Sequence, residues 1–348
     1  MGGNIIEDLK RLVFTPGPSG FEDLVRELVV KRLEDLGFSP KVDELGNVLL
    51  LPGGGNVELL LAAHMDELGF VITGISDDGL LSFRKLGGID DRILPGQHVM
   101  LILDDGSLVD GVIGLTPPHL QLDRSEQDRA PRWYELKIDV GASSREEAEA
   151  MGIRPLTPAV FKKHWSTLSQ GNIVASRGFD DRVGVALLLE IARKISEGSV
   201  SGEGVALAWT VQEEVGLRGA FYVGSKINAS TVIAVDTMAC CHPAITGSAK
   251  PGRGPIIRAL DNQHITPRWL VKSIVQSANN AGVKVQFASA GGTTDAAAFQ
   301  RAGIPSAAVG IPLKYTHTTA EMLHIRDALE ALKLLEGVID SIPKGAIA

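Results

Sequence analysis

Apolar residues recur at helical spacing near the start of the chain and then form a continuous run. The first segment, MGGNIIEDLKRLV, is amphipathic, and the second, SGFEDLVRELVVKRLEDLGF, has apolar positions three and four residues apart, which predicts two helices. Ser19 and Glu22 have the spacing of a capping box at the start of the second helix. VELLLAA, Val57 to Ala63, is apolar throughout and indicates a strand covered on both faces. Residues 1–66 are therefore predicted to form two helices followed by two strands.

The pattern changes after Leu68, where short alternating segments replace the longer runs. FVITGISDDGLLSFRKL and HVMLILDDGSLVDGVIG each place an Asp-Gly turn between alternating halves, which is typical of β-hairpins. WYELKIDV is predicted to be a further strand, and the polar stretch LQLDRSEQDRAPRW a solvated loop. We expect a small β domain or barrel, inserted at residues 67–167.

Strand and helix patterns alternate from Leu168 to the end of the chain. The expected helices are RVGVALLLEIARKI, LVKSIVQSANNAG and IRDALEALKLLEGVIDSI, and the expected strands are GVALAWTV, STVIAVD and IPSAAVGI. Such alternation is typical of a mostly parallel sheet with helices on both faces. The predicted fold is an α/β domain split into residues 1–66 and 168–348 by the inserted β domain.

The composition narrows the classes of function. Of the 348 residues, 44% are hydrophobic and 22% are charged, and the formal net charge is −8 without a basic stripe, which argues against a nucleic-acid surface. The apolar runs are too short to span a bilayer, and the N-terminus lacks the apolar core of a secretory signal. The adjacent Cys240 and Cys241 indicate no disulfide framework and fit a reducing compartment. We expect a cytoplasmic protein that binds neither nucleic acid nor a membrane.

Ionisable residues follow several predicted strands, where α/β sheets usually bind their ligands. Most stand at strand carboxyl ends, but Asp180 and Asp181 stand just before a helix. The full set is His64, Asp66, Asp180, Asp181, Glu213, Glu214, Asp236 and His317. Two histidines with several carboxylates suit Zn²⁺ or a neighbouring transition metal better than Ca²⁺ or Mg²⁺. In the His64-x-Asp66 spacing, one ring nitrogen can bind a metal while the carboxylate accepts a hydrogen bond from the other.

Each of these residues also has a purely structural explanation. A single strand-end carboxylate often caps a turn, and Asp180 or Asp181 could cap the helix that follows. The other histidines are expected to be surface or hydrogen-bonded core residues. The stretch Gly291-Gly292-TTDAAAF lacks the lysine of a phosphate-binding loop, so it is predicted to be a strand-to-helix turn. The recurrence of ionisable groups at so many strand ends is what favours a metal site.

Six stretches resemble the co-catalytic metallopeptidases whose best-known members are the tetrahedral (TET) aminopeptidases. They are AAHMDELGF, ASRGFDDRVG, TVQEEVGLRGA, AVDT, GGTTDAAAF and KYTHTTAEM, and they are distributed over nearly the whole chain. The resemblance implies an α/β fold of the phosphorylase/hydrolase-like kind, with a mixed sheet flanked by helices and an inserted small, PDZ-like β-barrel for dimerisation. It also implies two divalent metal ions per subunit, Zn²⁺ first and Co²⁺ as an alternative, and no other cofactor.

The resemblance also implies a role for each candidate residue. The metal ligands would be His64 and Asp236 for one ion, Glu214 and His317 for the other, and Asp180 for both. Asp66 would orient His64. Asp180 is chosen over Asp181 because the bridging aspartate of the family stands four residues before a glycine, here Gly184. A cis peptide bond would join the two aspartates.

The adjacent glutamates would then divide two tasks. Because side chains alternate along a strand end, Glu214 would bind a metal ion while Glu213 faces the substrate as general base. Glu213 would take a proton from a water held between the ions and return it to the leaving amine. The predicted function is a metal-dependent aminopeptidase that removes N-terminal residues from short peptides, with Glu213 and Asp66 as its catalytic residues.

The resemblance further implies a homo-oligomer that takes up oligopeptides. Twelve subunits, built from dimers through the inserted domain, would form a hollow tetrahedron that folded proteins cannot enter. The loop around Leu120–Trp133 would reach the substrate pocket of a neighbouring subunit. Related members also occur as dimers, so a smaller oligomer is the alternative.

Other functions are compatible with the same residues. A related zinc-dependent deacylase or carboxypeptidase would need a cation for the substrate carboxylate, and four arginines are available: Arg182, Arg218, Arg253 and Arg258. Asp236, where those relatives often have Glu, favours the aminopeptidase. A metal-independent glycoside hydrolase would also use paired carboxylates. A non-enzymatic assembly protein is disfavoured by the complete set of ligands.

Overall fold

The large sheet is built around strands that are apolar at nearly every position. β3 (Val57–His64), β12 (Val205–Thr210), β13 (Ala229–Ala239) and β16 (Ser306–Lys314) pair in parallel in the order β12-β3-β13-β16. Both faces of such strands must be covered, which explains the continuous apolar runs. The computed structural model describes residues 2–120 and 129–341, and within them this sheet has eleven strands.

Antiparallel strands complete the sheet on both sides of this parallel centre. On the β12 side they are β2 (Val48–Leu50) and β1 (Lys41–Val42). On the β16 side they are β17 (Glu321–His324), β11 (Ile173–Ser176) and β10 (Ser166–Leu168), with β14 (Ile256–Leu260) also pairing antiparallel to β16 and β15 (Gln286–Ser289) parallel to β14. The predicted mixed sheet is confirmed, whereas the expectation of a mostly parallel sheet holds only for its centre.

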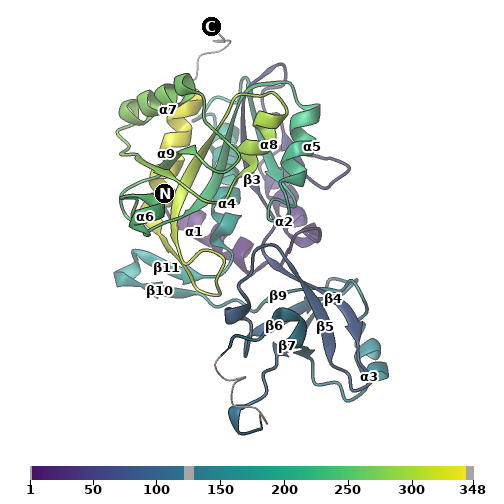
Figure 1. The fold of residues 1–348 in the computed structure, drawn as a ribbon. Helices are drawn as coiled ribbons and strands as arrows, with labels where there is room; N and C mark the ends of the chain where they lie inside the picture. The colour runs from purple at the N-terminus through teal and green to yellow at the C-terminus, as the bar shows by residue number, and fades with distance from the viewer. Residues whose placement is uncertain (1, 121–128, 342–348) are drawn as a thin grey trace.

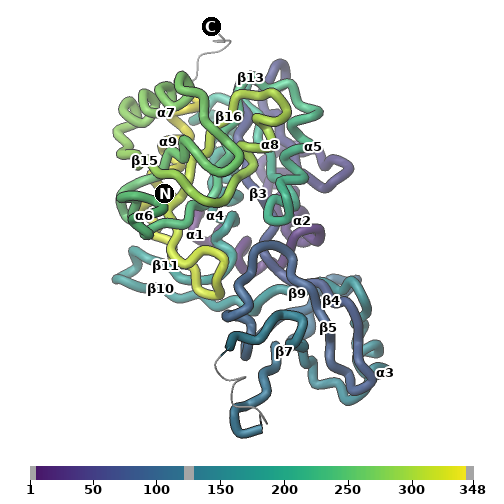
Figure 2. The backbone as a smooth tube through the Cα atoms, in the orientation of Figure 1, coloured from purple at the N-terminus to yellow at the C-terminus, as the bar shows by residue number. Residues whose placement is uncertain are grey.

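Helices cover both faces of the sheet (Figure 2). Alternate residues of β3 show the division, because Leu59 and Leu61 join one buried cluster while Leu60 and Ala62 join another. The first cluster is completed by α1 (Gly2–Phe14), α2 (Asp23–Asp35), α4 (Phe179–Ser196), α7 (Arg268–Asn280) and α9 (Ile325–Ser341). The second is completed by α5 (Arg218–Lys226) and α8 (Asp295–Arg301). A short α6 (Pro243–Thr246) follows β13.

A separate closed barrel lies below the sheet and its helices in the view of Figure 1. Its strand order is β4 (Gly69–Ile75), β5 (Leu81–Leu86), β8 (Ile138–Asp139), β7 (Leu108–Ile113), β6 (His98–Ile102) and β9 (Pro158–Phe161). Phe70 contacts Phe83 and Phe161 edge to face inside it, at centroid distances of 5.2 and 4.9 Å. α3 (Arg145–Ala150) packs its Ala148 into the same core. These strands fall within the predicted insertion at 67–167, and the use of the barrel in assembly stays a prediction.

Two local predictions are wrong. WYELKIDV forms a 3₁₀ turn, Trp133–Glu135, and only the two-residue strand β8. The turn is held by hydrogen bonds from the Arg132 N–H to the Glu135 carboxylate (2.7 Å) and from the Leu136 N–H to the Trp133 oxygen (3.2 Å). No capping box opens α2. Ser19 instead donates a hydrogen bond to the buried Asp66 carboxylate (2.6 Å), which needs a donor more than a partly solvated helix end does.

The chain passes into the barrel directly after β3 and returns directly after β9, so the barrel is attached beside the carboxyl end of a central strand (Figure 1). Residues 121–128 of the predicted solvated loop lie outside the described residues. No helix in the described part of the chain has the length and apolar character needed to cross a membrane.

Candidate metal and catalytic site

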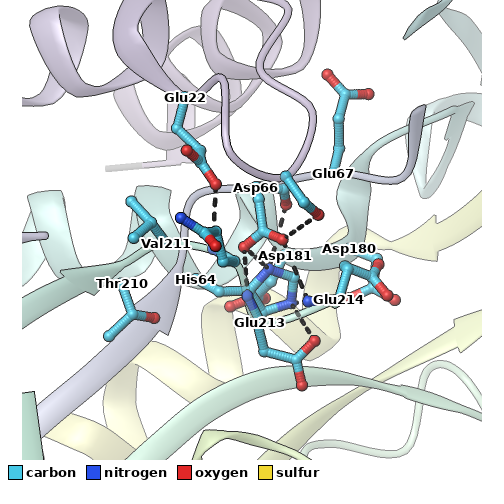
Figure 3. A network of polar contacts seen from close by, with 12 residues as sticks. Glu22, His64, Asp66, Glu67, Asp180, Asp181, Thr210, Val211, Glu213 and Glu214 are labelled. Carbon is cyan, nitrogen blue, oxygen red and sulfur yellow. Dashed lines mark hydrogen bonds and ion pairs between the residues drawn. The ribbon is translucent and has the colours of Figure 1, made fainter. Parts of the chain in front are cut away.

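His64 is the last residue of β3 and is only 2% exposed. With its proton on Nδ1, the ring donates a hydrogen bond to the backbone oxygen of Asp66 (3.2 Å), and the carboxylate Oδ1 of Asp66 lies 3.5 Å from the same nitrogen. Nε2 then faces Asp180 Oδ1 at 3.4 Å and Asp236 Oδ1 at 3.8 Å. Figure 3 shows Asp66 beside the His64 ring, with Asp180 close by. This arrangement leaves Nε2 available to a metal ion. The hydrogen bond that orients the ring goes to the backbone oxygen of Asp66, whereas the H-x-D spacing predicts its carboxylate as the acceptor.

Asp180 links two groups of potential ligands. It lies at the start of α4, and the peptide bond to Asp181 is cis, in agreement with the resemblance. Its Oδ1 faces His64, whereas its Oδ2 lies 3.2 Å from Nε2 of His317. The ligand-type atoms form two trios, each within 4.8 Å: His64, Asp180 and Asp236, and Asp180, Glu214 and His317. The structure therefore brings all five predicted metal ligands together.

The two glutamates are not held by strand alternation, which corrects the sequence interpretation. β12 ends at Thr210, and Gln212 has a left-handed φ of 57°. Their backbone N–H groups instead donate to Asp66, Glu213 to Oδ1 (2.9 Å) and Glu214 to Oδ2 (3.1 Å). Asp66 thus fixes both glutamates as well as His64 (Figure 3).

The side chains of the pair nevertheless diverge. Glu214 Oε1 lies 3.4 Å from His317 Nε2, whereas Glu213 Oε2 lies 4.0 Å from His64 Nε2. Glu213 belongs to neither trio of potential ligands. The Glu213 carboxylate therefore lies beside the site without being one of the proposed metal ligands.

Asp180 and Asp181 have non-helical backbone angles, and Asp181 caps the regular part of α4 that follows them. Its Oδ1 accepts a hydrogen bond from the Gly184 N–H (3.1 Å). A Cβ on Gly184 would lie 2.2 Å from Asp181 Oδ2, so a side chain there would displace this carboxylate. The glycine four residues after Asp180 thus has a physical reason, and of the two aspartates Asp180 is the one that faces the histidines.

Asp236 and His317 lie in different kinds of backbone structure, the first in a strand and the second in a loop. Asp236 lies inside β13, opposite Gly310 of β16, and not at the strand end that the sequence predicts. His317 lies in the loop between β16 and β17, has a left-handed φ of 65°, and its side chain is 39% exposed. One trio is therefore built on the sheet, and the other depends on a loop.

The electrostatics of the cluster fit divalent cations. Burial, with repulsion from Asp236 and other carboxylates, raises the pKa of Glu213 well above its usual value, and burial raises the pKa of Glu214 to about 8. Burial alone would lower the pKa of His317, but Glu214 and Asp180 raise it to about 9. Glu214 Oε1 has no hydrogen-bond partner among the described residues. Carboxylates buried in such excess need a cation, and two histidines with three carboxylates are a donor set for Zn²⁺ or a similar ion.

A cavity of about 520 Å³ opens onto this cluster. Of the four arginines considered from sequence, Arg258 lines it, is 5% exposed, and has its Nε 3.3 Å from Asp261 Oδ2. Its Nη2 has no hydrogen-bond partner among the described residues. Arg182 is buried elsewhere, against Glu67 (3.3 Å).

Several residues that support the site were not among the site residues predicted from sequence. Ser19 donates to Asp66, and the Thr210 hydroxyl donates to the buried Asp295 of the GGTTDAAAF stretch, which does form a turn into α8 as predicted. Glu321 accepts hydrogen bonds from the segments that carry Asp180 and His317. The available signal for Glu321 was its place in KYTHTTAEM, four residues after His317.

Comparisons with known proteins agree with this fold and site. The family model described as "M42 glutamyl aminopeptidase" matches residues 46–334. The chain is 32% identical over 341 residues to the lysyl aminopeptidase of Pyrococcus furiosus, with 97% of each chain covered. It is 30% identical over 354 residues to the glutamyl aminopeptidase of Lactococcus lactis, covering 99% of this chain and 98% of that one. The solved TET1 peptidase of Pyrococcus horikoshii, which can assemble into a tetrahedron or a large octahedral shell, superposes with a TM-score of 0.90 at 44% identity, covering 96% of this chain and 99% of that chain.

The fold and the site define a metal-dependent hydrolase of peptide bonds. The chain belongs to the M42 glutamyl aminopeptidase family. It is accordingly a metal-dependent aminopeptidase, and the resemblance to the tetrahedral aminopeptidases inferred from six short stretches is confirmed.

Proposed function

We propose that the site holds two divalent ions and removes N-terminal residues from short peptides. The ligands are His64 and Asp236 for one ion, Glu214 and His317 for the other, and Asp180 for both. The observation that carries this assignment is the Asp180 carboxylate, whose two oxygens lie 3.4 Å from His64 Nε2 and 3.2 Å from His317 Nε2. Zn²⁺ is the first choice for these nitrogen and oxygen donors, and Co²⁺ is the alternative.

Glu213 is the proposed general base. Ions bound at such a pair of sites polarise the scissile carbonyl and make a nearby water more acidic. Glu213 lines the cavity, and its buried environment raises its pKa, so its carboxylate accepts and retains a proton more readily than an exposed glutamate. It accepts the proton of the attacking water and then delivers it to the nitrogen of the leaving peptide.

Asp66 keeps this geometry, because its carboxylate accepts the Glu213 and Glu214 N–H groups and faces His64. The choice of the N-terminal end of a peptide is supported by the names of the similar proteins, a lysyl and a glutamyl aminopeptidase.

The direct test compares a free-amine peptide anilide with its N-acetylated form on zinc- or cobalt-loaded protein, followed by a varied peptide panel. We expect release from the free amine only, loss of activity with a chelator, and recovery with Zn²⁺ or Co²⁺. Protein that holds two ions but releases no N-terminal residue from any peptide would contradict the proposal. Activity that a chelator leaves unchanged would instead indicate metal-independent chemistry.

A related deacylase or carboxypeptidase is the second candidate, and Arg258 is the observation that favours it. Its Nη2 has no hydrogen-bond partner among the described residues and lies at the cavity, where it could bind a substrate carboxylate. Preference for the N-acetylated substrate, or release of C-terminal residues, would favour this function. Asp261 lies beside Arg258 and already offsets the charge of the guanidinium. We therefore rank the deacylase or carboxypeptidase function second.

We also propose that the chain works as a homo-oligomer built from dimers through the barrel, up to a tetrahedral dodecamer that admits oligopeptides. Support comes from the tetrahedral assembly of the similar TET1 peptidase. Light scattering should give the mass of twelve chains of 37.0 kDa, whereas a monomer at micromolar concentration would contradict it. The cytoplasmic location stays a prediction.

A further inference from the structure

Glu321 connects two segments that are far apart in the sequence. It is the first residue of β17 and is 2% exposed. Its Oε2 accepts hydrogen bonds from the backbone N–H groups of Gly178 (2.9 Å) and Phe179 (2.8 Å). Its Oε1 accepts one from the backbone N–H of His317 (3.1 Å). A single buried carboxylate therefore spans the start of α4 and the loop after β16.

Both segments carry a proposed ligand and both have unusual backbone geometry. Phe179 directly precedes Asp180, and Gly178 has a φ of 86°. His317 has a φ of 65°, in the left-handed region that costs a non-glycine residue free energy unless its surroundings hold it there. Arg177 also joins the two segments, because its Nη1 donates a hydrogen bond to the backbone oxygen of Thr318 (2.8 Å). Glu321 differs from it in accepting the N–H of His317 itself.

We propose that Glu321 is a positioning residue that sets the spacing between Asp180 and His317, and so the affinity of the half of the site that contains His317. This inference rests on the two-ion assignment of the proposed function. The physical reason is the number of acceptors: a carboxylate offers two oxygens, one to each segment, whereas an amide offers one.

A purely structural role would make a different prediction. Glu321 satisfies N–H groups at the buried start of α4, and their loss would cost stability wherever the ions sit. Such a role would lower the free energy of unfolding without distinguishing the two ions. A positioning role weakens one ion selectively.

The decisive variant is Glu321→Gln, which keeps the size of the side chain but can accept at only one end. Isothermal titration of metal-free protein with Zn²⁺ should show two binding events in the wild type. In the variant we expect the ion held by Glu214 and His317 to bind about 10- to 100-fold more weakly, with the other affinity unchanged. In a Glu214→Ala background, where only the ion of His64 and Asp236 remains, adding Glu321→Gln should leave the affinity for that ion unchanged.

Asp327→Asn is the matched control. Asp327 is also buried and also spans two backbone N–H groups, with Oδ2 accepting from Gly252 (2.6 Å) and Oδ1 from Gly254 (2.8 Å). This variant also weakens a pair of hydrogen bonds to a buried carboxylate, but both donors lie in one loop that carries no proposed ligand. Both zinc affinities should remain at wild-type values, while its unfolding midpoint falls much as that of Glu321→Gln does.

Equal weakening of both ions in Glu321→Gln, no weakening of either, or the same change in Asp327→Asn would each overturn the inference. Should Glu321→Gln not fold, hydrogen exchange of the wild type decides. The His317 amide should be protected although its side chain is 39% exposed, and rapid exchange would overturn the inference. A wild type that binds fewer than two ions would overturn the two-ion proposal itself, whereas two ions with an unaffected variant would overturn only the role of Glu321.

Discussion

The two halves of the site are built in different ways although they share Asp180. His64 and Asp236 belong to neighbouring parallel strands of the sheet, β3 and β13, and both are buried. Glu214 and His317 belong to a turn and a loop, and the His317 side chain is 39% exposed. The geometry of the first half comes from the packed core. The second half depends on hydrogen bonds that its backbone N–H groups donate to Asp66 and Glu321.

This difference predicts unequal ion affinities. Ligands on rigid elements lose little freedom when they bind an ion, but ligands on loops must be ordered. We therefore expect the strand-borne half to bind its ion more tightly, and the loop-borne half to release its ion first when a chelator is added. Variants that are expected to remove both ions, one ion or neither test whether the two halves differ in this way.

The largest effect is expected from Asp180→Ala, which removes the only ligand shared by both halves. Both zinc affinities should fall, each by more than the roughly 100-fold upper range for losing a partner that merely orients a ligand. Calorimetry and metal analysis of dialysed protein would measure this. Retention of one ion at wild-type affinity would show that Asp180 serves one half alone.

Removing one ligand from each half should separate the two ions. Glu214→Ala should retain one ion per chain and lose the loop-borne one, while Asp236→Ala should weaken the strand-borne ion. Identical binding curves for the two variants would mean that the halves are not distinct.

Glu213→Gln should leave both halves intact and lower turnover. Removing a general base typically costs about 10²- to 10⁴-fold, so kcat should fall by that range while two ions remain bound. Glu27→Gln, a change at an exposed position on α2, serves as the control and should keep wild-type kcat. Loss of an ion in Glu213→Gln would make Glu213 a ligand and not the base.

The smallest effect concerns stability. In Gly184→Ala the new Cβ would lie 2.2 Å from Asp181 Oδ2, and forced repacking of this kind costs about 1–3 kcal/mol of unfolding free energy. Gly74→Ala in β4 of the barrel meets nothing within 4 Å and should change stability by less than about 0.5 kcal/mol. Urea unfolding midpoints of the two variants would test the contrast, and equal midpoints would refute it.

The sequence predicted which ionisable side chains lie together at the site, but not the contacts that support them. His64 and Asp236 follow or lie in strands whose apolar runs are unmistakable, and the motif order supplied Asp180, Glu214 and His317. The divergence of the glutamate pair was expected from strand alternation, yet β12 ends at Thr210 before the pair begins. Their orientation depends on the Asp66 carboxylate, 147 residues away from Glu213 along the chain, and no local pattern encodes such a contact.

Ser19 and Glu321 make the same point. Ser19 has a good local capping pattern, but the buried Asp66 carboxylate offers its hydroxyl a stronger partner. Glu321 begins a strand and has no periodic signal for its role, because that role is defined by segments 142 residues and 4 residues away. A hydrogen bond between distant segments exists only once the sheet has brought them together.

The main helices and strands, the inserted β region and the kinds of donor atoms at the site can be predicted from the amino-acid sequence, because periodicity is local and ligand chemistry belongs to the side chain. Other features depend on the folded arrangement: Asp180 faces both histidines, Asp181 caps the regular part of α4, and one half of the site lies on strands while the other is held by hydrogen bonds that a turn and a loop donate. These features depend on contacts between segments that are far apart in the sequence. Such contacts form only when the whole chain folds, so no single stretch of sequence encodes them.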